Sequence, residues 1–211
     1  MKVLDRHFVV AFASIMLVYL FFLSRSEWDP MHAWNRAFAD VSLVLLVVTL
    51  MIGPLSRLIR LFNRYLSWRR ELGIWTAITA FVHVYILFDG WFKWQLIRVI
   101  AGIDQATGQL FFDPGFTLAN LIGLIGFIYV LLLALISNKK AIKFLGKPAW
   151  DYLQQKSSIL YMLIVIHTTF FLFFYRIGNG NWLQKPFLIF ITVMFILQWS
   201  VFFLTVQKKR S

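Results

Sequence analysis

Two histidines lie inside long apolar runs of this chain, where a titratable side chain is unusual. His83 stands in TAFVHVYIL and His167 in LIVIHTTFF, whereas His7 and His32 lie near the water-exposed ends of predicted helices. A polar group within an apolar helix is costly unless it is paired, so such residues usually mark a functional site. Each imidazole, taken alone, can form a hydrogen bond to a neighbouring helix or bind a metal ion through a ring nitrogen.

The composition predicts that the elements carrying these histidines cross a membrane. Of the 211 residues, 60% are hydrophobic and 18% are aromatic, which is more than the core of a soluble protein accommodates. Runs of about 20 apolar residues match the hydrocarbon thickness of a bilayer. We therefore expect an all-α membrane protein, a bundle of six transmembrane helices, with an irregular end to the second helix at Gly53 and Pro54. The predicted spans are 8–24, 41–56, 72–88, 116–137, 157–175 and 186–206.

The positive charge is distributed unevenly along the chain. The net charge is +12, and fifteen of the 21 Lys and Arg residues fall at the two chain ends, after the second span and after the fourth. The positive-inside rule then places both termini in the cytoplasm and makes the third and fifth helices run outward. This distribution favours a multi-pass protein of the inner (plasma) membrane over a nucleic-acid-binding protein.

The segments between the spans are too short for a soluble domain. The longest, about 89–115, contains Trp91, Trp94, Phe111 and Phe112, and we interpret it as an interfacial aromatic belt at the outer face. No GxGxxG follows a predicted strand, and no Walker-type loop is present, so a nucleotide-binding domain is not expected. The chain is predicted to form a single domain, 1–211, whose electron donor, if it is a redox protein, lies elsewhere.

The two histidines are predicted to lie at the same depth. The third helix enters near Arg70 and the fifth near Lys156, so His83 and His167 lie about 20 Å and about 17 Å along their helices. Two parallel helices can therefore direct both imidazoles into the interior of the bundle at one level.

The neighbouring residues restrict what two such histidines can bind. The chain has no cysteine, which excludes thiolate ligands and iron–sulfur clusters, and the apolar helices offer no nearby carboxylate to complete a zinc site. A haem needs only two axial ligands, and its macrocycle suits an aromatic-rich bundle. The pattern thus predicts a haem b with His83 and His167 as the axial iron ligands, which favours electron transfer.

Three further motifs occur in order: VTLMIGPLSRL, then RRELGIW before His83, then LLALISNKKAIKFLGKPAWDYLQ before His167. With these motifs, about residues 40–175 resemble the ferric reductase-like transmembrane domain family. Within that family, the pattern is similar to the haem-binding membrane subunit of the bacterial methionine-sulfoxide reductase system. The resemblance implies a donor in the cytoplasm or the quinone pool, sometimes a bound flavin mononucleotide (FMN), and an acceptor at the outer face.

The chain departs from the two-haem members of this family at a pair of positions. Those members carry a second histidine about fourteen residues before the first outer ligand and about thirteen before the other, where this chain has Arg69 and Gln154. The methionine-sulfoxide reductase subunits share the arginine but keep the second histidine. The resemblance therefore implies that the outer haem site is retained and the inner one is lost.

Several other residues can be interpreted either as part of a binding site or as ordinary structural residues. Arg69 and Arg70 can bind a flavin phosphate or simply satisfy the positive-inside rule. Gly123 and Gly126 can allow close approach of a helix or a macrocycle. Met162, five residues before His167, is interpreted as core packing.

Together these features predict a membrane oxidoreductase component that passes electrons from a quinol or flavin donor to an acceptor at the outer face. The expected partners are membrane lipid, a quinone or flavoprotein donor, and a periplasmic redox protein. The alternative is a membrane assembly or interaction protein that keeps the bundle without redox work.

Overall fold

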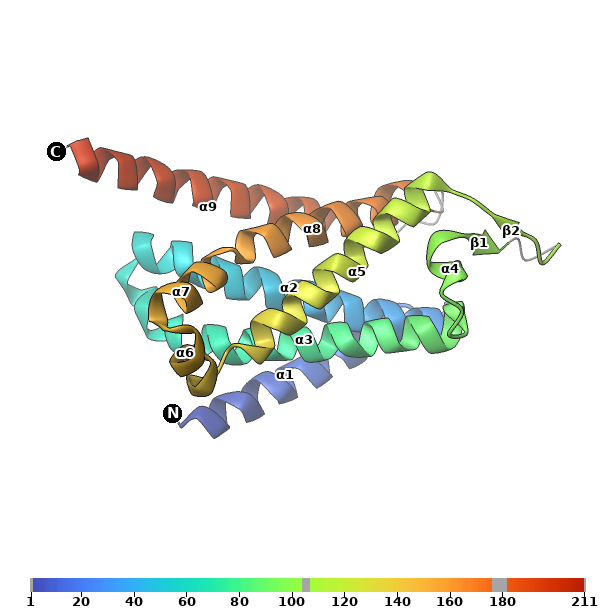
Figure 1. Cartoon of the computed structure of the whole chain (residues 1–211), viewed down its shortest axis with the longest axis horizontal. Helices are drawn as coiled ribbons and strands as arrows, with labels where there is room; N and C mark the ends of the chain where they lie inside the picture. Colours follow the sequence, from blue (N-terminus) through green and yellow to red (C-terminus); the bar gives the residue numbers. More distant parts are fainter. Residues whose placement is uncertain (1, 104–106, 176–181, 211) are drawn as a thin grey trace.

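A computed structural model describes residues 2–103, 107–175 and 182–210 of the chain (Figure 1). Within these residues, six helices are long and apolar enough to cross a membrane, which confirms the predicted all-α bundle. Four of them are α1 (Val3–Leu23), α2 (Pro30–Leu58), α5 (Pro114–Leu135) and α9 (Gln184–Arg210). The other two carry the histidines and are composite: η1 (Arg60–Trp68), α3 (Arg69–Ile86) and η2 (Leu87–Phe92) form one, and α7 (Lys147–Gln155), α8 (Ser157–Thr169) and η3 (Phe170–Phe174) form the other.

Helix α1 begins and α9 ends at the same end of the bundle, which we call the terminal end (Figure 1). The opposite end, the far end, carries α4 (Ile97–Ile100) and a two-residue hairpin of β1 (Gly102–Ile103) and β2 (Leu110–Phe111). The short helix α6 (Lys139–Leu145) lies with α7 at the terminal end. Helices α3 and α8 both run from the terminal end toward the far end, so the two helices are parallel (Figure 1).

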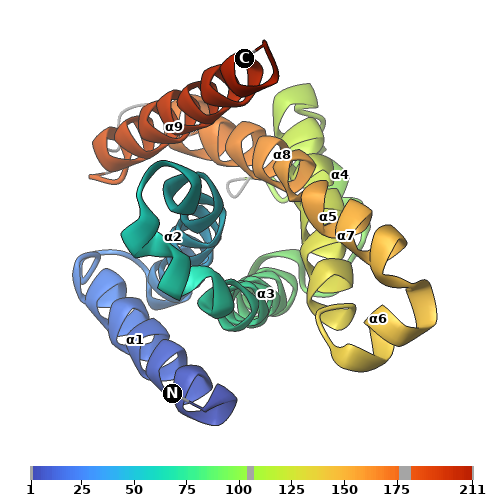
Figure 2. The same ribbon diagram turned by 90° about the vertical axis from the view of Figure 1, so that its left-hand side faces the viewer.

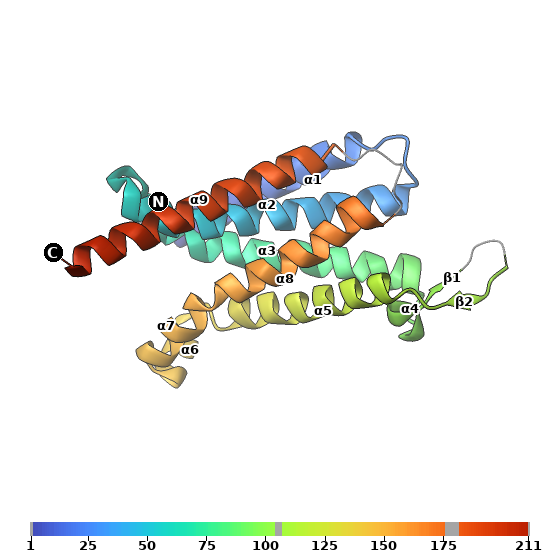
Figure 3. The same cartoon turned by 90° about the horizontal axis from the view of Figure 1, so that it is seen from above.

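Seen along the bundle, α2, α3, α5, α8 and α9 surround the centre, and α1 packs outside against α2 and α3 (Figure 2). The view from above shows α8 next to α5, and the two helices pack against each other (Figure 3). Large apolar side chains remain exposed on the outer helix faces, as a protein surrounded by lipid requires. Examples are Phe12 on α1, Ile125 on α5 and Phe195 on α9.

The second helix begins earlier than the sequence predicts. Asp29 caps α2 by accepting hydrogen bonds from the amides of Met31 and His32, and Pro30 occupies the first helical turn. The prediction of a start near residue 41 is therefore wrong. The prediction followed the apolar run alone, whereas α2 begins about three turns earlier, with a segment that mixes polar and apolar residues at the far end. Pro54 lies within the helix, which ends at Leu58.

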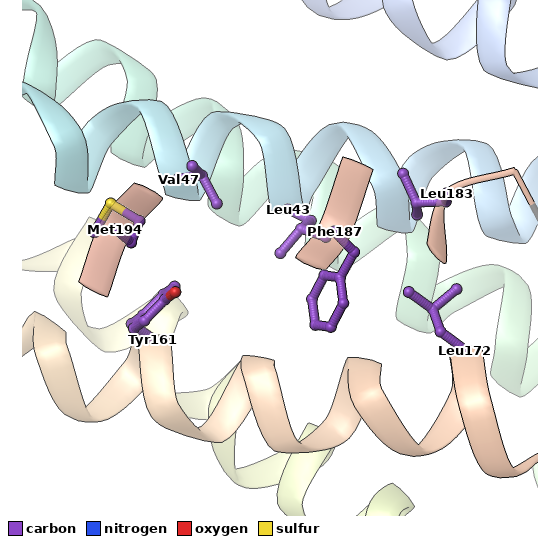
Figure 4. Close-up of a cluster of buried hydrophobic side chains, with 7 residues drawn as sticks. All are labelled: Leu43, Val47, Tyr161, Leu172, Leu183, Phe187 and Met194. Atoms are coloured by element: carbon purple, nitrogen blue, oxygen red, sulfur yellow. The ribbon is translucent and has the colours of Figure 1, made fainter. Parts of the chain in front are cut away.

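A cluster of buried side chains joins α2, α8, η3 and α9 (Figure 4). Phe187 and Met194 of α9 are essentially inaccessible, and they pack against Leu43 and Val47 of α2 and Tyr161 of α8. This cluster holds α9 against α2 and against α8, the helix that carries His167.

Two ion pairs join the first three helices of the chain. Arg25, in the turn after α1, donates a hydrogen bond to Asp40 of α2, and both side chains are almost completely buried. Arg6 of α1 donates to Glu71 of α3 at 3.0 Å, and Glu71 has no exposed surface. A buried carboxylate needs such a partner, so these pairs fix α1 and its turn against α2 and α3.

The far-end segment after α3 agrees only in part with the predicted aromatic belt. Trp94, Phe111 and Phe112 are exposed, with relative accessibilities of 61%, 50% and 68%. Trp91 differs, because it belongs to η2 and lines a cavity described below.

Candidate functional site

His83 is held by a reciprocal pair of hydrogen bonds with Asn35 of α2. The His83 Nδ1 lies 3.1 Å from the carbonyl oxygen of Asn35, and the Asn35 side-chain amide donates to the carbonyl of His83 at 3.0 Å. A carbonyl oxygen only accepts, so Nδ1 carries the proton and Nε2 carries the lone pair. Asn35 thus sets both the tautomer and the orientation of the ring.

His167 is held in the same way from the other side of the bundle. Its Nδ1 lies 2.8 Å from the carbonyl oxygen of Ala119 on α5. The lone pair of His167 is therefore also on Nε2. Two imidazoles with donating Nδ1 atoms and basic Nε2 atoms are the form in which histidine binds a metal.

Both imidazoles line the same two cavities. The central cavity, about 130 Å³, is mostly apolar and includes Leu43, Val84 and Ile164 in its wall. The far-end cavity, about 330 Å³, runs from the two histidines to Trp28, His32 and Tyr175. The structure therefore brings the two predicted site residues together at one place inside the bundle, between a mostly apolar central cavity and a more polar far-end cavity.

The helix α5 is adapted to the ring of His167 at Gly123. A Cβ atom added at Gly123 would lie 2.5 Å from the Cε1 atom of His167, which is far inside van der Waals contact. At Gly126 an added Cβ would lie 2.9 Å from the Cδ1 atom of Ile164 on α8. Both glycines thus permit close approach of α8, and Gly123 does so at the histidine.

We expect Gly123→Ala to destabilise the protein by about 1–3 kcal/mol, because the new methyl group must displace the His167 ring. Gly73→Ala is the matched control, since an added Cβ there meets nothing within 4 Å and alanine is the better helix former. The free energy of unfolding in detergent measures both. Equal stability of the two variants would contradict the close packing at Gly123.

A third cavity, about 680 Å³, lies at the terminal end and is lined by Arg57, Arg69, Arg70 and Gln154. The structure thus brings Arg69 and Gln154, the pair singled out in the sequence, to one cavity. Arg69 donates to the carbonyl of Thr49 at 3.2 Å, and Gln154 donates to the hydroxyl of Ser137 at 3.3 Å.

One layer of side chains lies between this terminal-end cavity and the central cavity. Its members line both cavities and are buried or nearly so: Leu46, Thr76, Val130 and Leu160. A molecule in the terminal-end cavity would therefore be separated from the histidine site by a single layer of protein.

A family model for the ferric reductase like transmembrane component matches residues 36–165. The chain belongs to this family. The match covers more than half of this ferric reductase-like protein, from α2 to α8, and includes His83, Arg69 and Gln154. It ends two residues before His167 and leaves α1 and α9 outside. Membership makes the protein a membrane electron-transfer component.

The structure of this ferric reductase-like protein also places residues that sequence reasoning missed or misread. Asn35, Arg36 and Asp40 of α2 line the site, although their segment was expected to precede the second helix. Met162 was interpreted as a core residue and is instead 56% exposed, on the outer face of α8. Trp150 lines the terminal-end cavity and donates to the carbonyl of Ile136 at 2.9 Å.

No group of three or more His, Cys, Asp or Glu side chains is positioned to hold a metal ion among the residues that the structure describes. A paired-histidine site does not need such a group, since a porphyrin supplies the other four ligands. Three features of the observed residues fit a haem. The imidazoles of His83 and His167 are oriented, the wall of the central cavity is mostly apolar, and Gly123 of α5 leaves room for the His167 ring.

Proposed function

We propose that this protein binds one haem b, with the Nε2 atoms of His83 and His167 as axial ligands, and that it carries electrons across the membrane. The observation that carries the proposal is that two imidazoles from different helices line the same cavities, each with its Nδ1 directed to a backbone carbonyl. When bound, the haem supplies a reversible one-electron change at its iron.

The protein residues supply orientation and a dry environment. The carbonyls of Asn35 and Ala119 fix the two rings and raise the basicity of their Nε2 atoms. The apolar wall of the central cavity excludes water. His83 and His167 would together hold the haem, and a haem held by two imidazoles would serve electron transfer rather than the binding of oxygen or substrate at the metal.

The terminal end is assigned to the cytoplasm, because most Lys and Arg residues lie at the chain ends and in the connections at that end. The protein is then a multi-pass protein of the inner membrane, and its histidine site opens toward the outer face through the far-end cavity. A periplasmic redox partner would meet the protein there, as in the methionine-sulfoxide reductase system that the sequence resembles.

The donor is assigned to the terminal-end cavity. Three arginines in its wall, Arg57, Arg69 and Arg70, suit the phosphate of FMN, and the polar groups also suit the oxygen atoms of a quinol. The single layer of side chains toward the central cavity supports electron entry from this side. A quinol of the membrane or a cytoplasmic flavoprotein would supply the electrons.

We expect the purified protein, expressed with haem supplementation, to show a Soret band and sharp alpha bands on reduction, as six-coordinate haem does. Adding a quinol, and separately a flavoprotein with its reductant, then tests the donor. Reduction by either supports the electron-transfer function. Failure of the protein to retain haem would overturn the proposal.

The alternative is a membrane assembly or interaction protein. It is supported by Arg69 and Gln154, which line the terminal-end cavity and stand at the positions where the resemblance implies histidines in two-haem members. A normal haem spectrum combined with no reduction by quinol or by flavoprotein would support this alternative.

A further inference from the structure

A basic segment extends sideways from the terminal end of the bundle. It comprises residues 138–147, that is, helix α6 with the residue before it and the turn into α7. Seen along the bundle, α6 lies outside the ring of helices, beyond α5 (Figure 2). The view from above shows the same displacement (Figure 3). The basic segment therefore lies beside the bundle, where lipid surrounds a membrane protein.

The length of α5 sets the depth of the basic segment. Helix α5 has 22 residues and no charged side chain, so it spans about 33 Å, close to the hydrocarbon thickness of a bilayer. Helix α6 begins only four residues after α5 ends. It is thus located at the level of the lipid headgroups, in the leaflet at the terminal end.

Contacts with the bundle fix which side of α6 faces outward. Ile142 lines the terminal-end cavity, so its side of α6 faces the bundle. At the start of α6, Asn138 caps the helix by accepting a hydrogen bond from the amide of Ala141 at 2.9 Å. Beyond the segment, Trp150 of α7 donates to the carbonyl of Ile136 at 2.9 Å. The side of α6 opposite Ile142 is left facing away from the protein.

That outward side of α6 combines lysines with one large apolar residue. Lys140, Lys143 and Phe144 have the spacing i, i+3 and i+4, which puts them on one face of the helix. Phe144 is 88% exposed, the highest value among the large apolar residues that the structure describes. Lys139 precedes this face and Lys147 follows it, and all four lysines are exposed.

The charge of the basic segment is not balanced within it. Residues 138–147 contain four lysines and no acidic residue, and the nearest acid in sequence, Asp151, pairs with Lys147. A cluster of four or more lysines beside the end of a transmembrane helix is typical of a site for anionic lipid headgroups. An aromatic side chain at the same depth packs against the upper part of the acyl chains. A soluble acidic partner would suit the lysines but would leave Phe144 without apolar contact.

We propose that the basic segment binds anionic phospholipid, with Lys140 and Lys143 at the phosphates and the ring of Phe144 among the upper acyl chains. The inference goes beyond the proposed function and does not require haem. It assigns a lipid site to a part of the chain that neither holds the cofactor nor crosses the membrane.

The test measures which lipid lies next to residue 144. The chain has no cysteine, so Phe144→Cys provides a single position for a fluorescent label. The labelled protein is placed in nanodiscs of equal amounts of phosphatidylglycerol and phosphatidylcholine. A quenching nitroxide is attached to the acyl chain of one lipid in the first sample and of the other lipid in the second. The ratio of the two quenching efficiencies gives the preference of the site for the anionic lipid.

We expect phosphatidylglycerol to be preferred about tenfold, and Lys140→Gln, Lys143→Gln to bring the preference close to one. Lys140→Arg, Lys143→Arg should keep the preference, because it keeps both charges. The matched control is Lys93→Gln, Lys185→Gln, which removes two exposed lysines from the far end and should leave the preference unchanged.

Two results would overturn the inference. Quenching by neither lipid would mean that residue 144 faces water or another protein, and equal quenching by both lipids would mean that the lysines select no anion. Both results are independent of the proposed function, because the haem spectrum is recorded separately in the same nanodiscs. Circular dichroism identifies a variant that fails to fold, and the arginine variant then provides the comparison.

Discussion

Alanine at His83 or at His167 is expected to abolish the low-spin haem spectrum while the six-helix bundle stays folded. Each ring supplies one of two axial ligands, and loss of a group that merely orients a ligand already weakens metal binding by about 10-fold to 100-fold. Loss of the ligand itself should therefore weaken haem retention by more than about 100-fold. Haem content per protein and the reduced spectrum measure the effect.

His7→Ala is the matched control for these variants, because His7 lies on α1 and lines none of the three cavities described. Glycine at His83 or His167 leaves space for free imidazole, which should restore part of the spectrum when added at high concentration. Full haem retention in the His83→Ala, His167→Ala double variant would reject the site.

Removal of Asp40 is expected to cost about 3–5 kcal/mol of stability, because the substitution leaves a buried charge without its partner. The side chains of Arg25 and Asp40 are only 2% and 6% exposed, so Asp40→Ala leaves a buried guanidinium without its carboxylate. Arg25 also donates to the carbonyl of Phe21 at 3.2 Å and lies over the rings of Trp28 and Trp182, which prevents it from reaching water. Unfolding in detergent measures the change.

An exposed pair provides the comparison for Asp40. Lys147 and Asp151 are one turn apart on α7, and the Nζ atom of Lys147 lies 2.8 Å from the Oδ2 atom of Asp151. Their side chains are 73% and 39% exposed. Asp151→Ala should change stability by less than about 1 kcal/mol, since water screens such a pair. The double variant Arg25→Met, Asp40→Leu should recover much of the loss, because it removes both charges. A cost below about 1 kcal/mol for Asp40→Ala would show that the pair is not needed.

The sequence was sufficient to predict the six-helix membrane bundle and the position of His83 and His167 close together inside it. Apolar runs of bilayer length are a strong signal, and parallel helices of similar length bring residues at similar positions to one level. The presence of Arg69 and Gln154 in one cavity also follows from their similar spacing before His83 and His167. These features depend on helix geometry alone, which local sequence determines.

The polar half of the site could not be found from hydrophobicity. Asn35, Arg36 and Asp40 precede the apolar run of α2, so a criterion based on that run excluded them. A helix-start signal was nevertheless present, since Asp29 followed by Pro30 is typical of an N-terminal cap. The partners of these residues, the backbone of His83 and the side chain of Arg25, depend on tertiary packing and leave no trace in local sequence.

The short π-helical segments follow the two histidines closely: η2 begins four residues after His83, and η3 begins three residues after His167. A π turn holds one residue more than an α turn, so each segment rotates everything beyond it by about 100° relative to an uninterrupted α-helix. Trp91 and Phe92 owe their place on the cavity wall to that extra residue. The number of residues in η2 and η3 is therefore as constrained as the identity of their side chains. A deletion of one residue in either segment would leave the preceding imidazole in place but would rotate the aromatic rings at the mouth of the cavity away from it.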